Sequence, residues 1–282
     1  MTTTLFNSNL TAKINLIGAE LFSLESNNKE YIWEGNPDFW GKHSPVLFPI
    51  VGTLKNNTYS YKTISYQLSR HGFARDNEFK LIDQKENSAT FSIQSNEETL
   101  KIYPFDFELQ LIYTLEENSL NIQYKVINKG KVQMPFSIGA HPALALPGVF
   151  ENYSIEFEIE EPLVYNLLEN DLISNNTKTL ATVENKVILN YNLFENDALI
   201  FKNLKSNSLT IFEQQKPLIR MHYKDFPHLG IWTKKNAPFL CIEPWFGYSD
   251  STESIGNIME KEGIQILEPQ ATFNSQFSIE IL

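Results

Sequence analysis

The sequence predicts an all-β protein, built as a large sandwich of antiparallel strands. Apolar and polar residues alternate at period two along most of the chain, and the alternating runs are rich in Ile, Phe, Tyr and Val. Turn signals such as NKGK, LKNN and KSNS recur at short intervals, whereas helical periodicity is scarce. No βαβ alternation, glycine-rich phosphate loop or repeat is present, so residues 1–282 are interpreted as one domain of many strands.

The expected strands occur in every part of the chain. Within 107–128, LEENSL (115–120) is expected to be the turn of a hairpin, and FENDALI (194–200) has room for one helical turn. The runs interpreted as strands are TAKINLIG (11–18), TISYQLSR (63–70), TFSIQS (90–95), the two arms of 107–128, YSIEFEIE (153–160), KVILN (186–190), SLTIFEQ (208–214), LIRMHYK (218–224) and QFSIEIL (276–282).

The amino-acid composition limits which partners the protein can bind and in which compartment it is expected. Apolar residues make up 42% of the 282, enough for a substantial core, and the formal charge is 23 − 34 = −11. This acidity argues against binding to nucleic acid or anionic membranes, which need clustered Lys and Arg. Cys241 is the one cysteine, so no internal disulfide is possible. With no signal-peptide pattern and no run of about 18 apolar residues, a cytoplasmic protein is expected.

Three polar residues occupy positions that are unusual for a strand protein. His71 follows a predicted strand in SRHGFARD (69–76) and precedes a glycine. His141 lies where a strand is expected to leave its sheet, because Pro142 cannot donate to a ladder. Glu243 lies inside the apolar run FLCIEPWF, where a carboxyl group should have a raised pKa unless it has a partner.

Two histidines and a carboxylate at strand exits can converge at one end of a sandwich. Such a trio fits an acid–base pair with an orienting group, and it equally fits a metal site. Each residue also has a structural alternative. His71 would be a turn residue bonded to the backbone, His141 a buried support for the bend, and Glu243 a partner of Arg75 or of a lysine.

The arginines and tryptophans near these motifs have ordinary interpretations as well. Arg70 and Arg75 are two of only three arginines in the chain, and both could simply pair with Asp76 and Glu78. The tryptophans expected to pack in the core are Trp232 and Trp245.

These motifs resemble the aldose 1-epimerase (galactose mutarotase-like) superfamily, and more closely its LacX-type branch. The similarity spans most of the chain, from about residue 10 to the C-terminus, and the segments occur in family order. The His-Gly and Glu-Pro-Trp segments are specific when they occur together. The matching segments are PVLFPIVGTL (45–54), SRHGFARDNEF (69–79), YPFDFELQLIYTL (103–115), IGAHPAL (138–144), FENDALIF (194–201) and FLCIEPWFG (239–247).

The resemblance implies a β-supersandwich that interconverts the α and β anomers of an aldose without a metal or organic cofactor. It assigns Glu243 as general base, His141 as general acid, and His71 as a donor that orients the sugar ring. Asp197 matches an aspartate that binds sugar hydroxyls, and Arg75 is expected to contact the ligand. The expected partner is therefore a small sugar or sugar phosphate, bound by a monomer or a homodimer.

One departure leaves the sugar open. Galactose-specific members carry an arginine shortly before the first histidine motif, and PIVGTLKNNTY (49–59) has none. Some relatives with a similar HGFAR segment act on hexose 6-phosphates, and an arginine pair can also reach a phosphate. The alternatives are a hexose-6-phosphate mutarotase, a cupin-like isomerase with His71, His141 and Glu243 as metal ligands, and a non-catalytic carbohydrate-binding protein.

Overall fold

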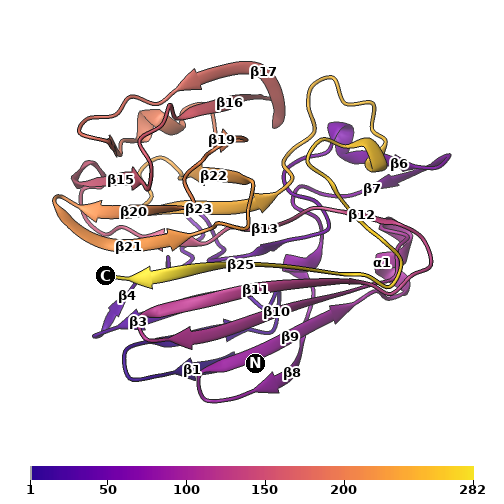
Figure 1. Ribbon diagram of the computed structural model, residues 1–282, viewed down its shortest axis with the longest axis horizontal. Coiled ribbons are helices and arrows are strands. Elements are labelled where there is room, and N and C mark those ends of the chain that lie inside the picture. The colour runs from indigo at the N-terminus through magenta and orange to yellow at the C-terminus, as the bar shows by residue number, and fades with distance from the viewer. Residues whose placement is uncertain (1) are drawn as a thin grey trace.

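The computed structural model describes residues 2–282 and confirms an all-β architecture of antiparallel sheets (Figure 1). The larger sheet has nine strands, and β25, β11, β10 and β9 run side by side through it. In sheet order its strands are β18 (Lys186–Ile188), β15 (Tyr153–Phe157), β20 (Ser208–Glu213), β21 (Lys216–His222), β25 (Thr272–Ile281), β11 (Ser119–Asn128), β10 (Phe107–Glu116), β9 (Ser88–Gln94) and β8 (Lys80–Gln84).

The second sheet has eight strands and carries the residues of interest. One of its eight strands, β14 (Ala143–Ala145), pairs with β23 outside the main strand order. In sheet order the others are β17 (Leu172–Thr179), β16 (Val164–Glu169), β19 (Leu199–Phe201), β22 (His228–Trp232), β23 (Phe239–Phe246), β13 (Ile138–Ala140) and β5 (Val46–Leu47).

Smaller sheets and short helices complete the fold. Among residues 2–282, no helix is long and apolar enough to cross a membrane. The minor strands are β1 (Thr2–Phe6), β2 (Thr11–Asn15), β3 (Leu21–Ser26) and β4 (Lys29–Glu30) in one sheet, β12 (Met134–Phe136) with β24 (Gln265–Leu267), and β6 (Thr58–Tyr61) with β7 (Ile64–Gln67). The helices are α1 (Glu97–Ile102) and the 3₁₀ turns η1 (Lys55–Asn57), η2 (Ala74–Asp76), η3 (Phe150–Asn152), η4 (Tyr191–Phe194) and η5 (Ile258–Glu260).

Each alternating run predicted to be a strand overlaps one, although β9, β21 and β25 begin before the run and several others end before it does. The hairpin expected across 115–120 is confirmed, because Glu116 pairs with Ser119 at the closed end of β10 and β11. Along both arms every second side chain is buried. These side chains share the main core with Leu240 and Ile242 of the second sheet, so the core lies between the two large sheets.

Two helical details differ from the expectation. The turn expected within 194–200 lies earlier, at η4, and the chain is already extended at Leu199. Helix α1 was not predicted, since six residues are too few to show a helical period. Its local signal is a capping box, in which the Asn96 side chain accepts from the Thr99 amide and the Thr99 hydroxyl accepts from the Asn96 amide.

Apolar and polar residues do not alternate along β23, because both faces of this strand are covered by other parts of the protein. All of its residues except Phe246 are buried. Leu240 and Ile242 face the main core, whereas Cys241 and Trp245 belong to two smaller clusters on the opposite face. Because side chains alternate along a strand, Glu243 shares that second face with Cys241 and Trp245.

Candidate active site

His141 and Glu243 lie directly opposite each other across two paired strands. Strands β13 and β14 run along the same side of β23 in a single register, and His141 and Pro142 fill the break between them. Pro142 cannot donate to the ladder, but its carbonyl still accepts from the Ile242 amide at 3.3 Å. The pairs that set the register are Gly139 with Trp245 and Ala143 with Cys241.

This arrangement corrects two expectations, because the chain does not leave the sheet at His141 but resumes the same register along β23 at Ala143, and Glu243 is not at a strand exit. Glu243 lies in the middle of β23, where it pairs with Gly230 of β22. The residues therefore meet on the face of the eight-stranded sheet, because β23 runs alongside the break between β13 and β14. The sequence did not reveal this position, since a strand buried on both faces has no period from which its ends can be read.

The Glu243 carboxyl group is almost completely removed from water. It is 1% exposed, and its Oε2 lies 3.2 Å from His141 Nε2. Neither that oxygen nor His141 Nδ1 has a hydrogen-bond partner within residues 2–282. The alternative interpretation of Glu243, a salt bridge to Arg75 or to a lysine, is wrong, because within residues 2–282 its carboxyl group contacts the His141 imidazole and forms no salt bridge to Arg75 or to a lysine.

Burial shifts the two pKa values in opposite directions. Desolvation raises the pKa of Glu243 well above its usual value, with the Arg70 charge opposing the shift and Asp197 adding to it. Desolvation lowers the pKa of His141 to about 3. Both shifts favour the uncharged forms, which places the proton of this pair on the carboxyl group.

His71 lies in the loop after β7, and its backbone and ring are both bonded to Gly52. Its amide donates to the Gly52 carbonyl at 2.9 Å, and its Nδ1 accepts from the Gly52 amide at 3.1 Å. The loop is tight, since His71 has φ +68° and a Cβ on Gly72 would meet the Phe48 carbonyl oxygen at 2.3 Å. The backbone-bonded interpretation is therefore correct for Nδ1, while Nε2 lies on the side of Arg70.

A single proton must be assigned between the two nitrogens of His71. Burial, with His141 and two arginines nearby, lowers the pKa of His71 well below its usual value, so the ring is neutral. Arg70 Nε lies 3.2 Å from Nε2, yet a ring with one N–H cannot accept at both nitrogens. The Arg70 side chain is 41% exposed and can turn its Nε to water, whereas the buried Gly52 amide has no other acceptor within residues 2–282, so we assign Nδ1 as the acceptor and place the proton on Nε2.

Arg70 pairs with two aspartates that the sequence did not connect to it. Its Nη1 lies 3.1 Å from Asp171 Oδ1, and its Nη2 lies 3.6 Å from Asp197 Oδ2. The expectation that Arg70 pairs with Asp76 or Glu78 is wrong. Asp171 comes from the turn between β16 and β17, a hairpin that is distant in sequence from the first histidine motif.

Arg75 and Asp197 also reach the same place. Arg75 lies 3.6 Å from Asp76, as the pairing interpretation predicted, and its Nη2 donates to the Arg70 carbonyl at 2.9 Å. Asp197 has φ +72°, and its Oδ1 accepts from the amide of Ala198 at 2.8 Å. This turn presents the Asp197 side chain at the start of β19.

All five residues predicted from the sequence line one cavity of about 290 Å³. That volume is near the lower limit for small-ligand pockets. A larger hollow of about 690 Å³ lies over β15, β20 and β21, but it contains none of the five. The lining residues are Trp40, Arg70, His71, Arg75, His141, Asp197, Ala198, Trp232, Glu243 and Trp245.

Trp40 is a member of the site that the sequence did not indicate. Its ring stacks on His141, with centroids 4.8 Å apart and planes inclined by 26°. Trp232 meets the same imidazole edge-on at 5.9 Å. The expectation that Trp232 packs in the core is incomplete, because it also lines the cavity. Trp40 lies in an irregular loop with no neighbouring motif, so no local pattern distinguishes it.

Trp245 packs in a small hydrophobic cluster on this face of the sheet and also lines the cavity. It is 4% exposed, and its Nε1 donates to the Ala140 carbonyl at 3.2 Å. A Cβ added at Gly139 or at Gly230 would meet its ring at 2.4 Å. The ring therefore lies across two strands at positions where both neighbours lack a side chain.

The group closest to a metal site differs from the predicted one. Ligand atoms of His141, Cys241 and Glu243 all lie within 4.8 Å of one another, and all three residues are buried. The predicted trio had His71 in place of Cys241. Burial raises the pKa of Cys241 well above its usual value, so the residue is a neutral thiol and a poor ligand as it stands.

The chain matches the family model described as Aldose 1-epimerase over residues 1–279. It is 36% identical over 299 residues to the chromosomal protein LacX of Lactococcus lactis subsp. lactis, with 100% of both chains covered. A galactose mutarotase related enzyme from Lactobacillus acidophilus has a similar structure, with a TM-score of 0.96, 34% identity, and coverage of 100% of this chain and 97% of that one. The structure of a galactose mutarotase-like protein from Lactobacillus casei has a TM-score of 0.93 to this chain, with 29% identity and 100% of each chain covered. The predicted resemblance and fold are confirmed.

Proposed function

Because the chain belongs to the aldose 1-epimerase family, we propose that it interconverts the α and β anomers of an aldohexose. The observation that carries the proposal is the buried contact of 3.2 Å between His141 Nε2 and Glu243 Oε2. Mutarotation requires one proton to be removed from the sugar and one to be delivered to it. A carboxyl group and an imidazole in one cavity supply a base and an acid for these two transfers.

In the proposed reaction, Glu243 takes the proton from the C1 hydroxyl of the sugar. His141 protonates the ring oxygen, the bond from C1 to that oxygen breaks, and C1 becomes the carbonyl carbon of an open-chain aldehyde. Rotation about the C1–C2 bond exposes the other face of the carbonyl. The hydroxyl then adds to that face, the two proton transfers reverse, and the other anomer leaves.

The reaction needs the opposite proton distribution from the one that burial favours. A bound sugar stabilises that distribution, since its C1 hydroxyl donates to a carboxylate and its ring oxygen accepts from an imidazolium. Glu243 Oε2 and His141 Nε2 lie 3.2 Å apart, so a small adjustment as the sugar binds makes the hydrogen bond through which the proton passes to His141. Trp40, stacked at 4.8 Å, stabilises the imidazolium by a cation–π interaction.

The other three predicted residues bind and orient in this proposal. His71 carries its proton on Nε2 and donates it to the sugar ring oxygen, which fixes the ring against His141. Asp197 accepts from sugar hydroxyls. Arg75 lines the cavity beside Arg70, so its guanidinium group is placed to contact the ligand.

The charges around the cavity favour a neutral sugar over a sugar phosphate. The Arg70 guanidinium already contacts Asp171 at 3.1 Å and Asp197 at 3.6 Å. A phosphate that reached Arg70 would therefore meet two carboxylates as well, and like charges at such distances repel. Among the alternatives left by the sequence, the free aldohexose is the one that these contacts support.

The test is the mutarotation of freshly dissolved α-glucose and α-galactose, followed by polarimetry. Glu243→Gln keeps the shape of the side chain but cannot take a proton, so turnover should fall by about 10²- to 10⁴-fold. Thermal unfolding provides the control, and the variant should unfold near the wild-type temperature because the amide replaces a carboxyl group that burial keeps uncharged. A folded variant with near wild-type turnover would remove Glu243 as the base and favour a carbohydrate-binding protein.

A metal-dependent isomerase is the second candidate, because His141, Cys241 and Glu243 bring three ligand atoms within 4.8 Å of one another. The two candidates differ in their response to chelation. Under the acid–base proposal, dialysis against EDTA should leave the rate of mutarotation unchanged. Loss of activity that zinc or manganese restores would instead favour the metal-dependent reaction.

A further inference from the structure

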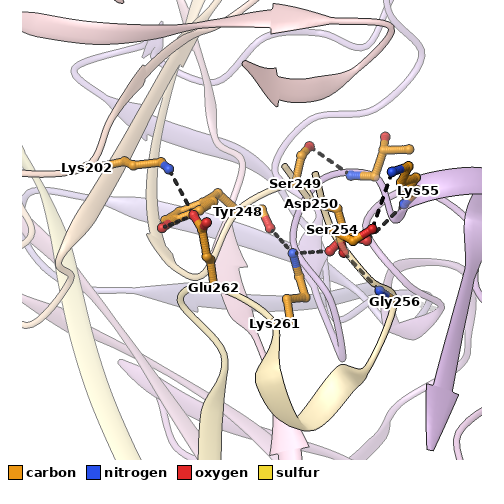
Figure 2. Close-up of polar contacts among 10 residues, drawn as sticks. Lys55, Lys202, Tyr248, Ser249, Asp250, Ser254, Gly256, Lys261 and Glu262 are labelled. Atoms are coloured by element: carbon orange, nitrogen blue, oxygen red, sulfur yellow. Dashed lines mark hydrogen bonds and ion pairs between the residues drawn. The ribbon is translucent and has the colours of Figure 1, made fainter. Parts of the chain in front are cut away.

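A buried ion pair lies outside the cavity, in the segment that follows β23. Lys261 Nζ lies 2.9 Å from Asp250 Oδ1, and each side chain is only 3% exposed. The same ammonium group donates to the Tyr248 carbonyl at 2.6 Å, and Figure 2 shows both contacts. Removing two charges from water costs free energy, and the attraction between the charges often does not offset this cost. A contribution to stability is therefore a weak explanation for the presence of this ion pair.

The second oxygen of Asp250 connects the ion pair to another part of the chain. Asp250 Oδ2 accepts from the Lys55 amide at 2.9 Å, and the Asp250 amide donates to the Thr53 carbonyl at 2.8 Å. Ser249 Oγ accepts from the Thr53 amide at 2.9 Å. Lys55 and Ser249 appear on opposite sides of Asp250 in Figure 2. These bonds fasten residues 249–250 to residues 53–55.

The fastened segment begins directly after Gly52, the residue that is bonded to His71. The Gly52 amide is the donor to His71 Nδ1, at 3.1 Å. A Cβ at Gly52 would lie 2.2 Å from Ser249 Oγ, so the two segments approach as closely as a glycine allows. A displacement of residues 249–250 is therefore transmitted to the amide that sets the proton position on His71.

Residues 249–250 also contact the hairpin that holds Arg70, the second hydrogen-bond donor to the His71 ring. The Asp250 carbonyl accepts from the Ile173 amide at 2.8 Å, and Ile173 follows closely on Asp171, which pairs with Arg70 at 3.1 Å. Arg70 Nε lies 3.2 Å from His71 Nε2. The His71 ring thus faces two N–H donors, the Gly52 amide at Nδ1 and Arg70 Nε at Nε2. A neutral ring has one nitrogen that can accept, so only one of these hydrogen bonds can form.

We propose that Asp250, held in place by Lys261, is a positioning residue that keeps the Gly52 amide against His71 Nδ1. With that bond made, the ring proton stays on Nε2, where it faces the ligand. Without it, Arg70 Nε donates to Nε2, the proton moves to Nδ1, and the ring can no longer donate to a sugar. The effect on turnover rests on the proposed function, whereas the tautomer is a property of the folded chain.

The experiment compares two double variants that differ only in the acceptor for the Lys55 amide. Asp250→Leu with Lys261→Met removes both charges and the acceptor, leaving no unpaired charge in the interior. Asp250→Asn with Lys261→Met also removes both charges but restores a carbonyl oxygen at the same place. Long-range ¹H–¹⁵N correlation spectra of ¹⁵N-histidine protein report the tautomer, and the His71 signals are assigned from their loss in His71→Asn.

The leucine variant should move the His71 proton to Nδ1 and lower kcat by roughly tenfold or more, with a smaller change in KM, because a misoriented group costs mainly rate. The asparagine variant should recover the wild-type tautomer. A leucine variant that folds and keeps the proton on Nε2 overturns the proposal. If the tautomer changes as expected but the wild-type protein shows no mutarotation, the positioning stands and the proposed function fails.

A single substitution keeps the proposal testable if the leucine variant does not fold. Ser249→Ala removes the acceptor for the Thr53 amide and leaves the ion pair intact, so it should shift the tautomer in the same direction. Ser275→Ala is the matched control, because this hydroxyl is also buried but has no hydrogen-bond partner within residues 2–282. An Nε2–H tautomer retained in Ser249→Ala, or the same shift in Ser275→Ala, contradicts the assigned role.

Discussion

Burial, rather than any one neighbour, sets the protonation of the two residues at the centre of the site. It is the largest cause of the raised pKa of Glu243 and of the lowered pKa of His141. Two groups that exchange one proton are best described as a pair with shared apparent pKa values. The local apolar residues around Glu243 predicted its shift, but no local residues predicted the burial that lowers the pKa of His141.

At this scale we predict a bell-shaped dependence of kcat/KM on pH. The reactive site holds one proton shared between Glu243 and His141, so activity should fall as the pH rises past the raised pKa of Glu243 and that proton is lost. Activity should also fall as the pH drops toward the lowered pKa of His141, about 3, where a second proton binds. Initial rates of mutarotation, corrected for the buffer-catalysed reaction, measure both limbs.

The alkaline limb identifies the carboxyl group. In Glu243→Gln the residual rate should lose the alkaline limb at the raised value, because the group whose pKa sets it is absent. An alkaline limb that persists unchanged in this variant would assign the ionisation to another residue and contradict the role of Glu243.

At the scale of the strand, paired glycines make room for Trp245. Gly139 lies opposite Trp245 on β13, and Gly230 lies on the other side on β22. A side chain at either glycine would occupy the volume of the indole ring. The tryptophan forms part of the cavity wall only because both neighbouring strands lack a side chain there.

We predict that Gly139→Ala lowers the free energy of unfolding by about 1–3 kcal/mol, the usual cost of overpacking a core. The new Cβ would meet the Trp245 ring at 2.4 Å, and the displaced ring would intrude on the cavity and lower kcat/KM. Urea denaturation and polarimetry measure the two effects. Gly41→Ala is the control, since its nearest contact would be 3.8 Å and ordinary packing is preserved. Equal effects in both variants would contradict the role of the Trp245 contact.

At the scale of the whole molecule, the formal charge of −11 bears on the choice of substrate. The negative electrostatic field of the protein does not change the binding of a neutral aldose. It repels a hexose 6-phosphate, as do the two aspartates around Arg70. The compartment, the single domain and the monomeric or dimeric state stay predictions from the sequence.

We therefore predict a higher kcat/KM for glucose than for glucose 6-phosphate at low ionic strength. Salt screens charge over about 10 Å at 0.1 M, so added salt should raise the value for the phosphate and leave that for glucose unchanged. Polarimetry of both anomerising sugars across a salt series measures this. A preference for the phosphate that weakens with salt would show that Arg70 and Arg75 form a phosphate site.

The sequence by itself determined the all-β class, the hairpin across 115–120 and five residues of the cavity. Alternation at period two reports burial on one face of a strand, and the His-Gly and Glu-Pro-Trp segments are local strings of residues. Neither kind of signal depends on which strands become neighbours. This is why His71, His141 and Glu243 could be named before their separation in space was known.

Only the tertiary structure decided what surrounds these residues. It placed Glu243 in mid-strand opposite His141, stacked Trp40 on that imidazole, and paired Arg70 with Asp171. It also joined Asp250 to Lys55 across a separation of 195 residues. Such contacts arise from strand order and register, which are set by the packing of the whole chain, so no short stretch of sequence encodes them.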